Sequence, residues 1–148
     1  MSMPGRLDAI YIKRMKLGPM DPVGEAELIA GKGIVGNANQ GWHRQVTIIE
    51  KEVWGEMMDR LDSDLPPTTR RANLLVEGIQ LAETRGKTLR IGNCRILING
   101  ETVPCERMDE ALPGLKEEMK PEWRGGAFGE VLDDGHVTVG DPVEWTDQ

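Results

Sequence analysis

The segment CRILINGETVPC, residues 94–105, contains the strongest turn signal in the sequence. The dipeptide Asn99-Gly100 lies between two short alternating runs, and this dipeptide favours a two-residue hairpin turn. Counting outward from the turn brings Cys94 opposite Cys105, at a Cα separation of about 5.5 Å. Pro104 then occupies a position where its missing N–H removes no hydrogen bond from the ladder. The segment therefore predicts an antiparallel hairpin with Cys105 at its open end.

Similar short runs recur along the chain and predict a mainly β fold. The runs expected to form strands are residues 7–12, 25–30, 45–49, 73–77, 88–91, 94–98, 128–132 and 137–145. Their spacing, with turn residues between them, is typical of a barrel or a sandwich. Residues 50–61 predict a helix, because apolar residues recur there at spacings of three and four. Residues 107–112 and 115–120 predict shorter helices.

Length and charge limit the classes of protein that the chain can represent. Its 148 residues suit one domain, 1–148, and its net charge of −7 argues against a nucleic-acid partner, because such partners are bound largely through Lys and Arg. No apolar run reaches the roughly 18 residues of a membrane span, and the N-terminus has no apolar signal segment. We expect a cytoplasmic protein without a membrane partner. A small anionic ligand is compatible with this composition where positive residues cluster.

Residues 31–36 read GKGIVG and match the pattern G-x-G-x-x-G. A dinucleotide site needs this pattern between a strand and the first turn of a helix. The residues that follow, NANQGWH at 37–43, cannot start an amphipathic helix, which argues against such a site. Because glycine tolerates positive φ, the segment either wraps an anion with its amides or forms a long barrel turn.

Basic residues stand directly before two of the predicted strands. His43 and Arg44 precede one of them, and Arg70 and Arg71 precede another. A guanidinium group binds phosphate through two parallel hydrogen bonds, so these residues are candidate phosphate ligands if the two strand ends meet. The alternative is two solvated strand ends paired with carboxylates. Asn73 either directs its amide at a heterocycle or caps a turn.

The two cysteines do not form a disulfide framework, so each is expected to be a reduced thiol. Cys94 either resolves an oxidised Cys105 or is a small buried hydrophobic residue. Near Cys105, Arg107 favours a thiolate, whereas Glu106 and Asp109 oppose it. A thiolate can act as a nucleophile, a persulfide carrier or a soft metal ligand.

Zinc binding and hydrolysis are two further chemistries that cysteine allows. Structural zinc needs about four ligands at characteristic spacings, and two cysteines with His43 and His136 provide no such spacing, so no zinc is expected. A cysteine-dependent hydrolase would need one of these histidines as its base. A non-catalytic binding or scaffold domain with a packed Cys105 is the remaining alternative.

Seven segments, taken in order, resemble those of the MOSC domain, which is named for the C-terminal part of molybdenum cofactor sulfurase. They are GIVG at 33–36, HRQVT at 43–47, RANLLVEGI at 71–79, PC at 104–105, PGL at 113–115, RGG at 124–126 and VGD at 139–141. Their order and spacing carry the resemblance, which covers nearly the full length of the chain.

The resemblance implies a barrel-like fold related to the β-barrel domain of pyruvate kinase. It also implies that Cys105 carries sulfur or ligates the molybdenum of the molybdenum cofactor (molybdopterin). Such a protein would act as a sulfur transferase, with a sulfur donor protein as its partner. The residues that the resemblance places at or beside the anionic pterin are Gly36, His43, Arg44, Arg71 and Asn73. Our hypothesis adds Arg107 as a further ligand. The family is also associated with pyridoxal phosphate. Asn37 replaces an aspartate that is usual in the family.

Overall fold

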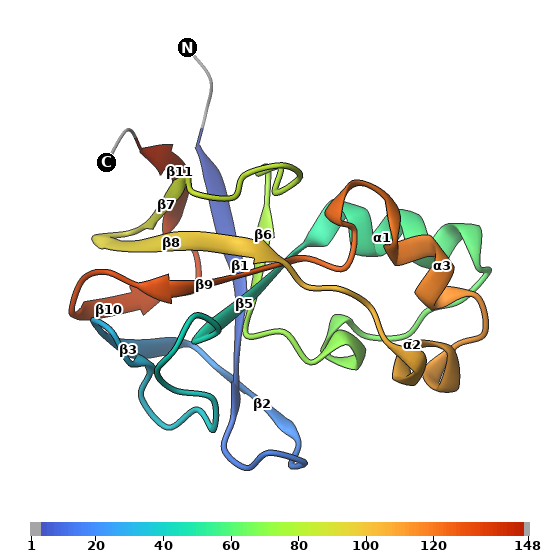
Figure 1. Ribbon diagram of the computed structural model, residues 1–148, viewed down its shortest axis with the longest axis horizontal. Coiled ribbons are helices and arrows are strands. Elements are labelled where there is room, and N and C mark those ends of the chain that lie inside the picture. Colours follow the sequence, from blue (N-terminus) through green and yellow to red (C-terminus); the bar gives the residue numbers. More distant parts are fainter. Residues whose placement is uncertain (1–3, 147–148) are drawn as a thin grey trace.

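The computed structural model describes residues 4–146. Within this range a ring of strands closes on itself (Figure 1). In order around the ring, the strands are β1 (Gly5–Lys13), β11 (Pro142–Thr146), β7 (Thr88–Ile91), β8 (Cys94–Glu101), β9 (Ala127–Val131), β5 (Val46–Glu50) and β6 (Leu74–Glu77). All neighbours in the ring are antiparallel except β5 and β6, which are parallel. The predicted mainly β, barrel-like fold is confirmed.

Three shorter strands complete a small second sheet beside the barrel. Their order is β10 (Gly135–Thr138), β3 (Glu25–Ile29) and β4 (Gly33–Ile34), while β2 (Met20–Val23) pairs with β1 at the edge of the large sheet. The barrel interior is filled by alternating residues of the strands, as β8 shows with a strict buried and half-buried alternation. The predicted run 137–145 is not one strand, because the turn at Gly140, with a φ of 101°, separates β10 from β11.

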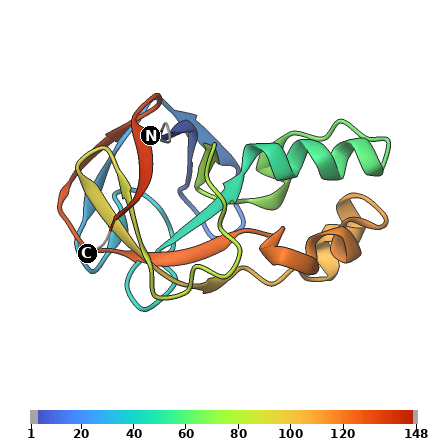
Figure 2. The same ribbon diagram turned by 90° about the horizontal axis from the view of Figure 1, so that it is seen from above.

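The helices form a separate layer to one side of the barrel (Figure 2). They are α1 (Lys51–Arg60), α2 (Glu106–Ala111) and α3 (Leu115–Met119), with short 3₁₀ turns η1 (Pro67–Arg70) and η2 (Pro121–Trp123). The prediction of helices near 50–61, 107–112 and 115–120 is confirmed. Six buried side chains make a second hydrophobic core among them: Trp54, Met57, Met58, Met108, Leu115 and Met119. In residues 4–146 no helix has the length and apolar character needed to cross a membrane.

The predicted hairpin at Asn99-Gly100 is wrong. Strand β8 runs through both residues and pairs with β7 on one side and β9 on the other. The turn lies at Gly92-Asn93, which joins β7 to β8, and Gly92 has the left-handed φ of 57° that a tight turn uses. Gly100 has a different role, because a Cβ there would lie 3.2 Å from the ring of Phe128.

The predicted pairing of Cys94 with Cys105 is therefore wrong as well. Cys94 begins β8, pairs with Ile91 and is fully buried, whereas Cys105 lies beyond the other end of the strand and is exposed. An eight-residue strand spans about 25 Å, so Cys94 cannot act as a resolving thiol for Cys105 in this fold. Cys94 is the small buried hydrophobic residue of the alternative interpretation, and its burial raises the pKa of its thiol.

Candidate functional site

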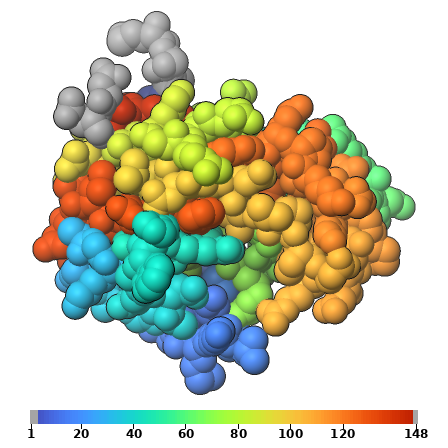
Figure 3. Space-filling view, viewed as in Figure 1, coloured from blue at the N-terminus to red at the C-terminus, as the bar shows by residue number. Residues whose placement is uncertain are grey.

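A pocket of about 220 Å³ opens beside strands β1, β5 and β6. The residues that line it are Lys13, Asn37, Asn39, Arg44, Gln45, Thr47, Arg71 and Asn73. They come from the end of β1, the β4–β5 loop, the start of β5 and the segment before β6. Figure 3 shows the β4–β5 loop and the β1–β2 loop next to each other on this face, with the segment before β6 visible at depth beside them. The pocket thus combines parts of the chain that are distant in sequence.

Asn73 holds the floor of the pocket together. Its Oδ1 accepts hydrogen bonds from the backbone N–H and the hydroxyl of Thr47, at 3.1 and 3.3 Å. Its Nδ2 donates to the carbonyl of Tyr11 and to Oδ1 of Asn37, both at 3.1 Å. The same Asn37 oxygen accepts the backbone N–H of Lys13 at 2.9 Å. The side chains of Asn73 and Asn37 therefore tie β1, β5, β6 and the β4–β5 loop to one another.

Asn37, which stands where the resembled family usually has an aspartate, uses both the donor and the acceptor of its amide. The residue is buried, and its Nδ2 also donates to the carbonyl of Asn39 at 3.3 Å, so both ends of the amide are engaged. An aspartate would keep the acceptor but lose the donor. The amide adds no negative charge to the pocket.

The walls of the pocket are positively charged. Burial lowers the pKa of Lys13, and the nearby charges of Arg71, Arg44 and Lys16 lower it further. Among the described residues, none of these four cations forms an ion pair with a carboxylate. In a chain with a net charge of −7, this is a local reversal of sign. Such a cluster favours an anion, because the anion relieves the repulsion among the cations.

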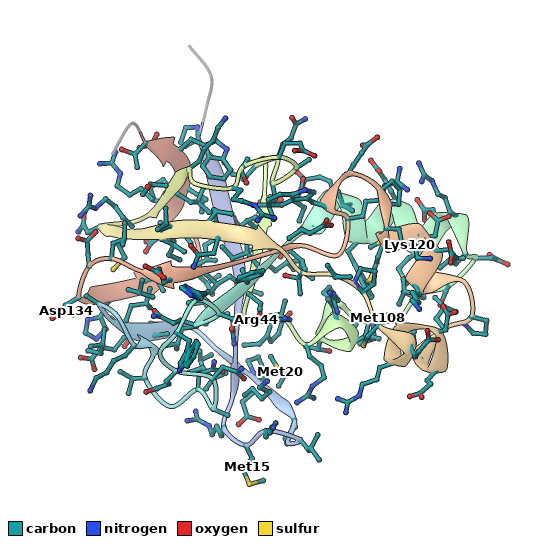
Figure 4. The ribbon with its side chains drawn as sticks, viewed as in Figure 1. Met15, Met20, Arg44, Met108, Lys120 and Asp134 are labelled. Carbon is teal, nitrogen blue, oxygen red and sulfur yellow. The ribbon has the colours of Figure 1, made fainter. Side chains whose placement is uncertain are left out.

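Arg44 is exposed and is positioned by an aromatic contact. Its guanidinium lies 5.6 Å from the centroid of the Phe128 ring, a cation–π distance, and the ring is accommodated by Gly100. Figure 4 shows Arg44 near the middle of the molecule, between the barrel and the helical layer. In the described structure its N–H groups donate no hydrogen bond to the protein, so they are available to a ligand.

Arg71 and Arg70 are neighbours in sequence but have different surroundings. Arg71 adopts the left-handed φ of 63° and donates one N–H to the carbonyl of Gly18 at 2.6 Å, leaving its other donors at the pocket. Arg70 donates to the carbonyls of Gly125 and Thr102, at 2.9 and 2.8 Å. Arg71 is thus a candidate ligand for an anion, whereas Arg70 is committed to the fold.

Arg70 connects the pocket to the segment that carries Cys105. Burial lowers its pKa to about 10, with a further decrease caused by Arg44 and an opposing effect of Cys105. One of its nitrogens also lies 3.7 Å from the sulfur of Met108 on α2. Its charge therefore lies within electrostatic range of both the Arg44 guanidinium and the Cys105 sulfur.

A smaller cavity of about 20 Å³ adjoins the pocket, with Arg44, Arg70, Arg71 and Thr102 among its lining residues. Thr102 is buried, and its hydroxyl is the one buried side-chain polar atom in residues 4–146 that has no hydrogen-bond partner. A cavity of this size has room for about one small ligand atom or a water molecule. This hydroxyl is therefore an unused donor or acceptor between the pocket and the cysteine segment.

Cys105 is a free, exposed thiol at the N-terminal end of α2. Its backbone is extended, and its carbonyl accepts the backbone N–H of Met108 at 3.0 Å. The exposure contradicts the alternative in which this cysteine is packed. Cys105 does not line the 220 Å³ pocket, and Thr102, three residues earlier, connects the two regions.

Three predicted site residues lie away from the lining of the pocket. Gly36 forms a turn with a φ of 88°, His43 is exposed with its Nδ1 3.9 Å from a Glu130 carboxylate oxygen, and Arg107 is exposed on α2. Of the predicted set, Arg44, Arg71 and Asn73 converge. Sequence reasoning missed Lys13, Thr47 and Thr102, although a run of basic residues from Lys13 to Lys16 marks the end of the first predicted strand.

The structure does not assemble the residues of a cysteine hydrolase. Within residues 4–146, neither His43 nor His136 hydrogen-bonds to the Cys105 thiol, and His136 lies on β10 opposite Glu27 of β3. The same range contains no group of three or more His, Cys, Asp or Glu side chains arranged to hold a metal ion.

Comparison with known proteins identifies the family. The family model of the MOSC domain matches residues 35–144, which is most of the chain. The chain belongs to the MOSC domain family. This MOSC domain contains all the lining residues of the pocket except Lys13 within the matched range, together with Cys105. No curated protein matches it.

Solved structures show that the MOSC fold extends over the whole chain. YuaD from Bacillus subtilis superposes with a TM-score of 0.82 at 20% identity, covering 99% of this chain and 98% of YuaD. YiiM from Geobacillus stearothermophilus has a TM-score of 0.74 at 15% identity, covering 97% of this chain and 76% of its own. YiiM from Escherichia coli has a TM-score of 0.72 at 18% identity, with coverages of 100% and 71%. At these identities the likeness shows a common fold.

Proposed function

We propose that this MOSC domain, acting as one domain over the whole chain, binds the anionic pterin of the molybdenum cofactor and presents sulfur to it from Cys105. The observation that carries the proposal is the cluster of Lys13, Arg44 and Arg71 at the pocket, where none of the three pairs with a carboxylate of the described residues 4–146. A phosphate group supplies the missing negative charge, and guanidinium groups bind it through charge-assisted hydrogen bonds.

The donors of the site fit such a cofactor. Arg44 and Arg71 keep free N–H groups for the phosphate. The amide of Asn73 is used by the protein, so we assign it the role of holding the pocket floor. Molybdenum, when bound, supplies a soft acceptor for sulfur, and Cys105 is the exposed thiol of this chain that can serve it.

Sulfur transfer requires a donor that carries sulfane sulfur, and we propose a protein persulfide. The Cys105 thiolate attacks the outer sulfur of the donor persulfide and forms a new S–S bond. The S–S bond of the donor breaks, and its electron pair leaves with the donor thiolate. Cys105 then holds a persulfide, and the exposed position at the start of α2 allows a protein donor to reach it.

Mass spectrometry after treatment with inorganic polysulfide tests the sulfur-carrying role. We expect the intact protein to gain the mass of one sulfur atom, about 32 Da, because one of its two thiols is an exposed nucleophile. The gain should disappear in Cys105→Ser and remain in Cys94→Ala. A sulfur adduct that survives in Cys105→Ser would contradict the proposal.

Spectroscopic titration with the molybdenum cofactor tests the binding role. We expect a thiolate-to-molybdenum absorption that is lost in Cys105→Ser, while the affinity for the pterin phosphate is lost in Arg44→Gln. Arg90→Gln, at an exposed arginine on β7 paired with Glu144, is the matched control and should behave as the wild type. An absorption unchanged in Cys105→Ser would exclude direct sulfur ligation.

A further inference from the structure

Trp42 lies beside the pocket and is strongly exposed. Its side chain is 84% exposed, whereas Trp54 and Trp123 are buried. It lines a hollow of about 400 Å³ together with Lys16, Ala38, Asn39, Gln40, Gly41 and Arg44. Asn39 and Arg44 also line the 220 Å³ pocket, so the hollow and the pocket adjoin. An exposed indole therefore stands next to the cation cluster.

The backbone at Trp42 is strained and is held by specific hydrogen bonds. Its φ of 61° is rare for a bulky residue and unfavourable without support from its surroundings. The Trp42 carbonyl accepts a hydrogen bond from Nε2 of Gln45 at 3.0 Å, and the Gly41 N–H donates to the carbonyl of Lys32 at 2.8 Å. Gln45 is itself buried, and its Oε1 accepts the backbone N–H of Val131 at 2.9 Å. The barrel thus fixes the backbone that keeps this indole outside the core.

The faces of the indole are largely free. The ring of His43 meets it at a centroid distance of 6.3 Å and an interplanar angle of 88°, an edge contact that covers one face at most. An indole in this position gains little stability for the fold, because most of its apolar surface remains in water. A strained and exposed aromatic residue therefore contributes more to the binding of a ligand than to the stability of the fold.

We infer that Trp42 is the stacking platform for a planar nitrogen heterocycle that is joined to the phosphate held by Lys13, Arg44 and Arg71. The inference rests on the proposed binding of an anion in the pocket. The ligand class is a heterocyclic phosphate ester, in which the ring is either a nucleobase or the pterin itself. The hollow shares Asn39 and Arg44 with the pocket, so one molecule can occupy both. Stacking on an aromatic face is tolerant of ring identity, because every such ring has a π-face.

Two pairs of ligands, in each of which one member has a heterocycle and the other has none, test the inference by calorimetry. The first pair is AMP and ribose 5-phosphate, and the second is neopterin triphosphate and inorganic triphosphate. We expect the ring to improve affinity about ten-fold in at least one pair. The pair in which the ring improves affinity more shows whether the heterocycle is a nucleobase or a pterin. In Trp42→Ala the gain should vanish while the affinities of the two ringless ligands stay unchanged, and Trp42→Phe should restore most of it.

Leu17→Ala is the matched control, because Leu17 is 79% exposed in the neighbouring loop but does not line the hollow. It should leave the ring-dependent gain intact. No gain in either pair, or an equal loss for ringed and ringless ligands in Trp42→Ala, would overturn the stacking role while leaving the anion pocket in place. If the ringless ligands do not bind the wild type at all, the anion pocket is wrong and the stacking platform falls with it.

Discussion

Two of the hollows on this molecule have opposite charge. The cation pocket measures about 220 Å³, whereas a groove of about 870 Å³ beside α1 is lined by Glu50, Glu52, Glu56 and Glu144 among other residues. The fold uses several of these carboxylates. Glu50 and Glu52 each accept a backbone N–H, and Glu144 pairs with Arg90 at 2.7 Å.

We infer from this difference that unpaired charge is a better guide to a candidate binding site than volume is. The groove is the larger hollow, but several of its charges stabilise the chain itself. In the pocket the cations repel one another, and within residues 4–146 they form no ion pair with a carboxylate. A ligand gains binding energy from charged groups that have no partner within the protein. The comparison predicts that charge changes in the two hollows have different consequences.

The largest effect is expected from reversing a charge in the pocket. Arg44→Glu should weaken the binding of inorganic pyrophosphate by about 100-fold or more, because a charge-assisted hydrogen bond is replaced by repulsion. Isothermal titration calorimetry measures this loss. Glu50→Gln, a charge change in the groove, should leave the affinity within about two-fold of the wild type. Equal losses in the two variants would remove the distinction between the hollows.

A smaller but clear effect is expected from the arginine that the fold already uses. Arg70→Met should lower the free energy of unfolding by about 3 kcal/mol, because the buried carbonyls of Thr102 and Gly125 lose their charged donor. Urea denaturation measures the change. Arg44→Met, which removes no hydrogen bond to the protein, should cost less than about 1 kcal/mol. Similar costs for the two variants would contradict the separate roles of these cations.

The smallest effect concerns the groove and depends on pH. Burial raises the pKa of Glu50 to about 7, so the folded state keeps a proton that the unfolded chain releases near its ordinary value. The free energy of unfolding should therefore fall as pH rises from about 4.5 to about 7. Near pH 8 the Glu50→Gln variant should exceed the wild type by about 1 kcal/mol, after allowance for solvent screening.

Urea denaturation at several pH values checks this expectation. The advantage of Glu50→Gln should shrink as pH falls from about 7 toward about 4.5, because below that range the wild-type carboxyl is protonated in both states. Glu56→Gln, at an exposed carboxylate of the same groove, is the matched control. An advantage of Glu50→Gln that does not change with pH would show that burial of the charge is not its cause.

Local patterns predicted most strands and helices but placed one turn wrongly. Asn99-Gly100 and Gly92-Asn93 are both turn dipeptides, and sequence alone favoured the first. The glycine at position 100 is explained by the Phe128 ring, a contact between distant segments that no local pattern shows. Strand β2 was missed because it contains Pro22, which the structure accommodates at the edge of the sheet.

The site could be predicted in part. The sequence shows the basic residues, but it does not show that they lie close together in the fold. Arg44 and Arg71 come together because β5 and β6 are parallel neighbours, a pairing between distant segments. Lys13 reaches the same pocket from β1, and the basic residues around it do not by themselves show which strand ends they meet. Arg70 and Arg71 are the same residue type, so the sequence cannot tell which of them faces the pocket. In the structure Arg71 has a left-handed backbone and lines the pocket, whereas Arg70 donates hydrogen bonds to the fold.

The sulfur and the cations belong to different halves of the molecule, since Cys105 begins the helical layer and Arg44 lies on the barrel. Arg70 lies between the halves and donates hydrogen bonds to the carbonyls of Thr102 and Gly125. Under the proposed function, the distance between the sulfur and the phosphate therefore depends in part on this one side chain.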